Sequence, residues 1–392
     1  MIEAFDLPSD LAPATAGDIA VINLKSSRQQ SWSRFWRAPE RPGTAESIVE
    51  QEQLTAQFVG DLAAFDRLEI LVNQLARTNP EAAQTSLIAA QVACATHRFA
   101  EATVSLAEAV ARGVPSDATE RLSLSLDQAT GKDLYGVLAA RRKRAAQPGR
   151  WEELVPLGAL LADLCEFDEA ERTYHQALRE YQDVSPFALA WVCFQLGVLW
   201  GELVPETQSS RGAQWYGKAI EYLPCYVKAR VHLAEICLDR GETGDARALL
   251  TPVLASGDPE VSWRLADVAQ REGHSAEAEA QRRAARSGFE GLLARHLLAF
   301  ADHAAEFYSG SGRDPARAVE LARVNLANRP TLPAFKLAHA TALAAGEPNV
   351  AELAADARKH WGGTLAFRFS PLAMQAAAAD HGRSRGHADA GT

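Results

Sequence analysis

The chain has 392 residues, 47% of them hydrophobic, which is enough apolar material for two or three ordinary domains or one elongated domain. A formal net charge of −10 argues against nucleic-acid binding by the whole protein, because an acidic chain repels the phosphate backbone. The N-terminus lacks a signal-peptide core, no uninterrupted apolar run reaches a membrane-spanning length, and the five cysteines form no CxxC pair. We therefore expect a soluble, cytoplasmic protein without membrane contact.

Residues 1–45 carry no repeat pattern and are predicted to form an extended N-terminal arm. Within this arm the stretch "DIAVINLK" alternates apolar and polar positions, which predicts a short strand or extended segment. The stretch "SWSRFWRAPERP" follows, and it is basic and aromatic in a chain that is otherwise acidic. The residues that single it out are Trp32, Arg34, Phe35, Trp36 and Arg37.

The rest of the chain repeats a fixed spacing of small and large apolar residues. In "LVPLGALLADLCEFDEAERTYHQALREY", Gly158 is followed by Ala170, then by Tyr174 and Ala177. This spacing is typical of two antiparallel helices, with small residues where the backbones approach and large ones filling the gap to the next pair. The same spacing recurs in sets that include Ala90, Ala102, Leu106 and Ala109; Ala234, Ala246, Leu250 and Val253; and Ala266, Ala278 and Ala285. It recurs with a turn about three residues longer in Gly197, Gly212, Tyr216 and Ala219.

Eight to nine helix pairs follow from this register. One pair alone cannot bury its apolar face, so the pairs are expected to stack into a superhelix over residues 46–375. The expected pairs span roughly 47–80, 81–114, 115–149, 151–185, 187–224, 226–257, 259–287, 291–330 and 333–361. Residues 376–392 lose the periodicity and are predicted to be a disordered tail.

The motifs "LGVLW", "QWYGKAIEYLP" and "LGALLADLCEFDEAERTYHQAL" resemble the tetratricopeptide repeat family. Its consensus has Trp-Leu-Gly-Tyr in the first helix and Ala-Phe-Ala-Pro in the second. The resemblance covers about residues 80–287 and extends more loosely to about 365. The opening Trp is mostly missing, and the unit at 115–150 departs from the consensus. The resemblance implies an all-α, right-handed superhelical solenoid.

The resemblance also implies that exposed positions of each first helix line a concave groove for extended peptides. Trp191 and Trp263 would be aromatic anchors, and the many carboxylates would favour a basic or apolar ligand. The alternative is that Trp191 and Phe194 belong to the core between repeats and that the acidic residues only solvate the surface. The candidate groove residues are Trp191, Phe194, Glu202, Lys228, His232, Glu235, Asp239, Trp263, Asp267 and Arg271, and the same register adds Gln84, Gln91, Glu152, Asp163, Arg264, Asp302 and Glu306.

The sequence contains none of the nucleotide-binding, zinc-protease or hydrolase motifs GxGxxG, GxxxxGK[ST], HExxH and GxSxG. His296 and His303 are interpreted as solvated or locally satisfied histidines. The basic run "RRKR", residues 141–144, is interpreted as a solvated helix face. We therefore predict no catalytic residues, no metal site and no cofactor.

Three functions fit these expectations. The leading hypothesis is a non-catalytic scaffold or adaptor that binds a partner protein or extended peptide in the concave groove. The second is an accessory, maturation or regulatory subunit of an enzyme complex that uses its convex or terminal surfaces. The third is a repeat enzyme with an unrecognised site. Fold resemblance alone does not choose among them.

Four interpretations of the N-terminal arm stay open. It folds back as a hydrophobic cap on the first helix pair, since a terminal repeat needs one. It lies in the acidic groove of its own or a neighbouring chain as a pseudo-ligand. It docks onto a separate protein, or it contacts membrane or nucleic acid.

Overall fold

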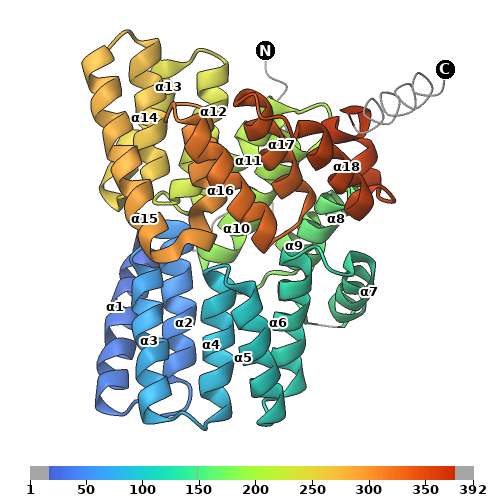
Figure 1. The fold of residues 1–392 in the computed structure, drawn as a ribbon. Helices are drawn as coiled ribbons and strands as arrows, with labels where there is room; N and C mark the ends of the chain where they lie inside the picture. Colours follow the sequence, from blue (N-terminus) through green and yellow to red (C-terminus); the bar gives the residue numbers. More distant parts are fainter. Residues whose placement is uncertain (1–16, 148, 376–392) are drawn as a thin grey trace, which may run out of the picture.

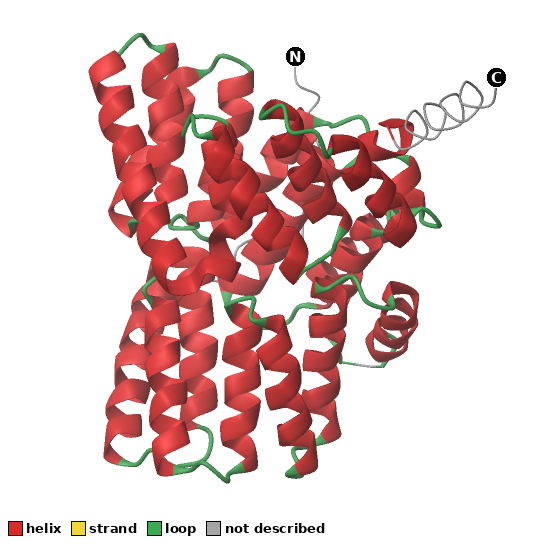
Figure 2. Cartoon of the chain, in the orientation of Figure 1, coloured by secondary structure: helices red, strands yellow, loops and turns green. Residues whose placement is uncertain are grey.

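The computed structural model describes residues 17–147 and 149–375, and within these ranges all regular structure is helical (Figures 1 and 2). The elements are α1 (Gly17–Arg37), α2 (Thr44–Leu54) with the π-helical turn η1 (Thr55–Val59), α3 (Ala64–Thr78), α4 (Ala83–Ala95), α5 (Phe99–Ala111), α6 (Ser116–Ala129), α7 (Leu134–Ala145), α8 (Trp151–Asp163), α9 (Phe167–Glu180), α10 (Pro186–Val198) with the π-helical turn η2 (Leu199–Leu203), α11 (Ser209–Tyr222), α12 (Val227–Asp239), α13 (Thr243–Leu250) with the 3-10 turn η3 (Thr251–Ser256), α14 (Pro259–Arg271), α15 (Ser275–Ser309), α16 (Pro315–Asn328), α17 (Leu332–Ala344), α18 (Val350–Trp361) and α19 (Leu365–Arg368).

Consecutive helices pack as antiparallel pairs, from α2–α3 through to α17–α18. The repeat spacing works as the sequence predicts, because the small residues face large rings of the paired helix. A Cβ added at Gly158 would lie 2.6 Å from the Tyr174 ring, and one at Gly197 would lie 2.5 Å from the Tyr216 ring. The prediction of an all-α superhelical solenoid of stacked helix pairs is confirmed.

The prediction of an extended arm is wrong for residues 17–37, which form α1, and the predicted strand at "DIAVINLK" lies inside this helix. Leu24, Ser31 and Phe35 are buried at spacings that place them on one face of the helix. Phe35 packs with Ile48 and Leu68 in the core beneath α1. The alternation of apolar and polar residues over eight positions is a weaker determinant of secondary structure than the buried stripe along the whole of α1. Residues 1–16, the start of the predicted arm, and the tail at 376–392 lie outside the described residues.

The loop predicted between 287 and 291 does not form either. Residues on both sides belong to α15, which runs as one helix until non-helical backbone angles at His296 bend it (φ −136°, ψ 51°). Gly288 lies within this helix and packs closely against Pro259, where a Cβ would come within 2.9 Å. The second half of α15, beyond His296, serves as the first helix of the next pair, with α16.

The superhelix contacts itself along a seam, which we define as the contacts of α2, η1, α3 and the turn after α4 with α10, α12, α15 and α16. Phe58 in η1 is buried against Phe187 and Tyr226, with ring centroids 5.2 and 4.7 Å apart. Gly60 follows in a left-handed conformation (φ 72°), and a Cβ there would lie 2.7 Å from Val227. In Figure 1 the N-terminal helices lie below the later pairs, and the end of α2 therefore meets the starts of α10 and α12.

Polar contacts extend the seam at the bend of α15. His296 Nε2 lies 2.8 Å from the Asp66 carboxylate, and Arg295 also pairs with Asp66. The backbone oxygen of His97 accepts a hydrogen bond from Asn328 Nδ2 at 2.9 Å. Residues about 230 positions apart in sequence are thus in direct contact.

Two arginines of the "RRKR" run are buried, so the prediction of a solvated face is wrong for half of it. Arg144 pairs with Glu153 at 2.7 Å, with Asp117 at 3.0 Å and with Glu120 at 2.8 Å. Arg141 is also buried, whereas the two residues between them are exposed. The alternation follows from the helical period, which turns positions three apart to the same side.

One helical segment among the described residues, Pro186–Leu203, is long and apolar enough to cross a membrane by length and composition alone. Just over half of it, 56%, is buried inside the protein. Its buried side chains, which include Leu189, Val192 and Leu196, belong to the largest core cluster. This burial is what a core helix of a repeat protein requires.

Candidate functional site

We call the side of the solenoid that carries α10, η2, α12, α14 and the second half of α15, the first helices of their pairs, the first-helix face. It carries a ladder of ion pairs. Glu202 Oε1 lies 2.7 Å from His232 Nδ1 and also accepts a hydrogen bond from the Tyr216 hydroxyl. Arg264 pairs with Glu235 and, at 3.4 Å, with Asp267. Five residues of the predicted groove therefore face one another or a common partner.

These contacts shift the protonation equilibria of the ladder. Burial alone would lower the pKa of His232, but the hydrogen bond and charge of Glu202 raise it above its ordinary value. Burial alone would raise the pKa of Glu202, but His232 lowers it. For Glu235, burial is the stronger effect and raises the pKa, although Arg264 and His232 act against it. The ladder thus favours a charged His232–Glu202 pair.

The prediction that Trp263 offers aromatic surface to the groove is wrong. Its side chain is buried, packs edge-on against Phe289 and Phe307, and is covered by the Arg264 guanidinium 3.7 Å from the ring centroid. Trp191 and Phe194 are half-buried and pack against the main core, with Phe194 lying 5.3 Å from Tyr226. These aromatic rings chiefly join neighbouring repeats.

A pocket of about 520 Å³ opens between α12 and α14 on the first-helix face. It brings together five of the predicted groove residues. Asp239 and Arg271 are exposed and 4.0 Å apart, whereas Asp267 and Glu235 are half-buried. The residues that line it are Glu235, Leu238, Asp239, Arg264, Asp267, Gln270 and Arg271. We call it the acidic pocket.

Lys228 lies apart from the acidic pocket, in a cavity of about 340 Å³ at the seam that also contains Asp258, Glu260, His97 and His303. His303 Nδ1 lies 2.6 Å from Glu260 Oε1. Burial, together with the charge of Glu260, raises the pKa of Asp258 well above its ordinary value. Burial alone would lower the pKa of His303, but the carboxylates of Asp302 and Glu260 raise it to about 10.

The N-terminal arm residues divide by the face of α1 on which they lie. Trp32 donates its indole N–H to Glu52 at 2.7 Å, and Phe35 is fully buried. Arg34, Trp36 and Arg37 are exposed. Among the four interpretations of the arm, the cap on the first helix pair is the one that these contacts favour for α1.

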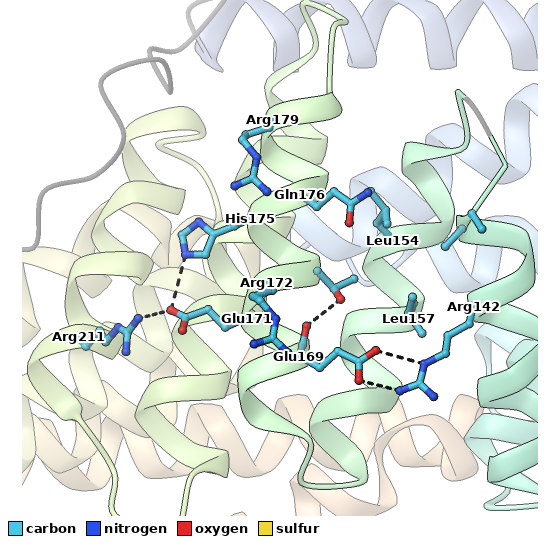
Figure 3. Close-up of a pocket in the computed structure, with 13 residues that line it drawn as sticks. Arg142, Leu154, Leu157, Glu169, Glu171, Arg172, His175, Gln176, Arg179 and Arg211 are labelled. Carbon is cyan, nitrogen blue, oxygen red and sulfur yellow. Dashed lines mark hydrogen bonds and ion pairs between the residues drawn. The ribbon is translucent and has the colours of Figure 1, made fainter.

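The largest pocket described here lies on the opposite face, among the second helices α7, α9 and α11 and the side of α8 (Figure 3). Its volume is about 760 Å³. Four arginines from three helices point toward it, and two glutamates lie between them. We call it the arginine pocket; it is lined by Arg142, Ala145, Ala146, Leu154, Leu157, Glu169, Glu171, Arg172, Thr173, His175, Gln176, Arg179 and Arg211.

Among the described residues, no group of three or more His, Cys, Asp or Glu side chains is placed to hold a metal ion.

No protein-family model and no curated protein sequence matches the chain. Solved structures of similar architecture include Cut9 from the APC/C Cut9–Hcn1 hetero-tetramer, with 12% identity over 83% of this chain and 55% of that chain at a TM-score of 0.35. Yeast Tom70 has 11% identity over 94% of this chain and 97% of that chain, also at 0.35. Human IFIT1, solved as a dimer with PPP-AAAA, has 13% identity over 94% of this chain and 96% of that chain at 0.33.

The repeat spacing together with the stacked helix pairs shows the architecture. The chain is an all-α solenoid of stacked antiparallel helix pairs. Identities and TM-scores this low transfer no function from a neighbour to this repeat protein, so its function has to be argued from its own surfaces.

Sequence reasoning missed the arginine pocket in this repeat protein, although it had a signal. Arg172, His175 and Arg179 follow a three- and four-residue spacing on the exposed side of α9, opposite the buried Tyr174 and Ala177. By itself such a polar stripe predicts a solvated helix face. Only the structure shows that arginines of α7 and α11 converge on it. Asp258 and Glu260 were not predicted as site residues, because the sequence "DPE" is typical of an ordinary helix start.

Proposed function

We propose that this repeat protein is a non-catalytic interaction scaffold that holds an extended, basic segment of a partner protein along the first-helix face. The observation that carries the proposal is the acidic pocket. Its carboxylates come from two successive first helices, and Asp239 is 86% exposed at its rim. A groove that presents carboxylates from consecutive repeats suits a segment that runs across the repeats.

Charge complementarity supports a basic ligand. The acidic pocket contains three carboxylates, from Glu235, Asp239 and Asp267, against two arginines. Arg264 is already paired with Glu235, and Arg271 donates to the backbone oxygen of Leu238. An incoming lysine or arginine therefore meets a net negative site in a chain that is negative overall.

The ladder also supports a binding role rather than a catalytic one. Its charged groups pair mainly with one another, as in structural ion-pair networks, whereas catalysis needs a nucleophile and a base that converge on a substrate.

The cysteines Cys94, Cys165, Cys193, Cys225 and Cys237 are all free thiols, which supports the further proposal of a reducing, cytoplasmic location.

The test uses the full chain and a fluorescein-labelled lysine–glycine peptide in an anisotropy titration. Changing Asp239 and Asp267 to asparagine together is expected to weaken binding by about fivefold to tenfold, and added salt is expected to weaken wild-type binding. The matched control changes Asp168 and Glu108, exposed acids on second helices, to their amides and should bind like wild type. Equal losses in both variants, or no binding at low salt, would contradict the proposal.

Trp263→Ala is not a suitable probe of the first-helix face. Because the ring is buried against Phe289 and Phe307, its removal is expected to destabilise the fold by about 3 kcal/mol or more. A loss of binding in that variant would not separate recognition from unfolding.

A second candidate function uses the outer face, as an accessory or regulatory subunit of an enzyme complex. The arginine pocket is the observation that favours it, because it is the largest pocket described and lies away from the first-helix face. Size-exclusion chromatography of the protein with a purified candidate enzyme would test it, and a complex that survives Asp239→Asn/Asp267→Asn but not changes in the arginine pocket would support it.

A further inference from the structure

We infer that the arginine pocket is a docking site for an acidic peptide segment of a partner protein, with two carboxylates that engage Arg172 and Arg179. The inference does not depend on the first-helix face. The two sites lie on opposite helices of the repeats and prefer ligands of opposite charge.

Arg172 and Arg179 are the two cations of the pocket that lack an acidic partner. Both are exposed on α9, and no carboxylate of the part of the chain that the structure describes lies within ion-pair distance of either. They point along the same side of the helix, with Gln176 between them (Figure 3). Their guanidinium groups offer paired N–H donors suited to carboxylates.

The acidic residues of the pocket do not oppose an incoming anion, because arginines already neutralise them. Glu169 receives two hydrogen bonds from Arg142, at 2.7 and 3.2 Å. Glu171 pairs with Arg211 and lies 3.6 Å from His175 Nε2. The pocket therefore carries four arginines against two glutamates, a net positive site on a chain of charge −10.

Part of the pocket wall is held in place before any ligand binds. Glu171 accepts the indole N–H of Trp200 at 3.2 Å, and the Arg211 guanidinium stacks 3.6 Å from the centre of the same indole. Burial alone would raise the pKa of Glu171, but His175 and Arg211 lower it below its ordinary value. A fixed, charged wall lowers the ordering cost of recognition.

The geometry sets the spacing of the acidic residues in the ligand. Arg172 and Arg179 are seven positions apart, a rise of about 10 Å along the helix. Three residues of a polyproline II segment span about 9 Å and complete one turn, so residues i and i+3 lie on the same side. Carboxylates at positions i and i+3 of such a segment match the two arginines, and the apolar floor of Leu154 and Leu157 suits the intervening side chains.

The experiment measures the anisotropy of fluorescein-labelled peptides with the full-length protein. The probe is a nine-residue peptide with Asp at every third position and Ala elsewhere, and its counterpart has Asn in place of Asp. Wild type is expected to bind the Asp peptide at least about tenfold more tightly than the Asn peptide at low salt, with the difference shrinking as salt rises.

Arg172→Gln/Arg179→Gln is expected to remove about tenfold of the affinity for the Asp peptide. The control Arg77→Gln/Arg368→Gln removes two exposed arginines outside the pocket and should bind like wild type. Far-ultraviolet circular dichroism should show the same helicity for all three proteins. The charge-reversed Arg172→Glu/Arg179→Glu variant should abolish binding of the Asp peptide.

Three outcomes would overturn the inference. The Asp and Asn peptides bind alike, the pocket variant binds as tightly as wild type, or the control loses as much affinity as the pocket variant.

A labelled single-stranded oligonucleotide of the same charge serves as a competitor. If it binds more tightly than the Asp peptide through the same two arginines, the assignment to an acidic peptide is wrong. Unchanged binding of the lysine–glycine peptide would show that the first-helix face is unaffected.

Discussion

Trp32 donates its indole N–H to the fully buried carboxylate of Glu52 at 2.7 Å, and this bond joins α1 to α2. The same carboxylate accepts hydrogen bonds from Arg67 at 2.7 and 2.9 Å and lies 3.5 Å from Arg28. The basic, aromatic segment is thus explained in part, because its Trp32 and the preceding Arg28 help to satisfy a buried acid.

Removal of this carboxylate is the first prediction. Glu52→Ala leaves Arg67 without its buried partner and is expected to lower the free energy of unfolding by about 3 kcal/mol. Urea denaturation followed by circular dichroism measures it. Glu50→Ala, an exposed neighbour on the same helix, should change stability by no more than about 0.5 kcal/mol. Similar effects of the two substitutions would mean that α1 is not anchored through Glu52.

The two adjacent aromatics of α1 provide a second test. Phe35→Ala is expected to cost about 3 kcal/mol or more, because Phe35 is fully buried with Ile48 and Leu71. Trp36→Ala should cost less than about 1 kcal/mol, since its ring is 54% exposed. Thermal unfolding of both variants gives the comparison. The cap interpretation of α1 fails if Trp36 is the more sensitive position.

Gly60 tests the seam. Gly60→Ala and Gly241→Ala both place a side chain on left-handed backbone, with φ of 72° and 79°, and this strain costs about 1 kcal/mol. Only at Gly60 does the new Cβ also meet Val227, at 2.7 Å, whereas nothing lies within 4 Å at Gly241. Gly60→Ala should therefore be clearly the more destabilising in urea. Equal losses of unfolding free energy in the two variants would show that the close contact with Val227 at the seam adds no strain.

The Glu260–His303 pair predicts a pH dependence. The pKa of His303 is raised from an ordinary 6.5 to about 10, so the pair stabilises the folded state fully below about pH 6.5 and loses this effect as the pH rises to about 10. The difference in unfolding free energy between wild type and His303→Gln should be largest at pH 6 and smallest above pH 10. Urea titrations at several pH values measure it, and a difference that grows with pH would have the wrong sign.

The sequence predicts the helix pairs well because each depends on local spacing. Gly158 and Tyr174, or Gly197 and Tyr216, lie within one pair and report a contact between neighbouring helices. The bend at His296 was not predictable in this way. The expected boundary between the pairs at 259–287 and 291–330 falls inside α15, where Gly288 is helical and packs against Pro259.

The candidate site was less predictable, because it depends on contacts between distant segments. Trp263 occupies an expected groove position, yet Phe289 and Phe307 bury it. The arginine pocket requires α7, α9 and α11 to converge, and no single repeat contains it. Periodicity identifies which side of a helix is polar, but not which other helix that polar side faces in the folded protein.

The seam changes how this protein should unfold. In an open repeat array, stability is a sum over neighbouring repeats, and the ends can fray independently. Here Phe58 is packed against Tyr226, and Asp66 is paired with His296, so opening the N-terminal pair also exposes the middle and later pairs. Such contacts raise the contact order of an otherwise local fold. We therefore expect a single cooperative transition in place of stepwise loss of repeats from the ends.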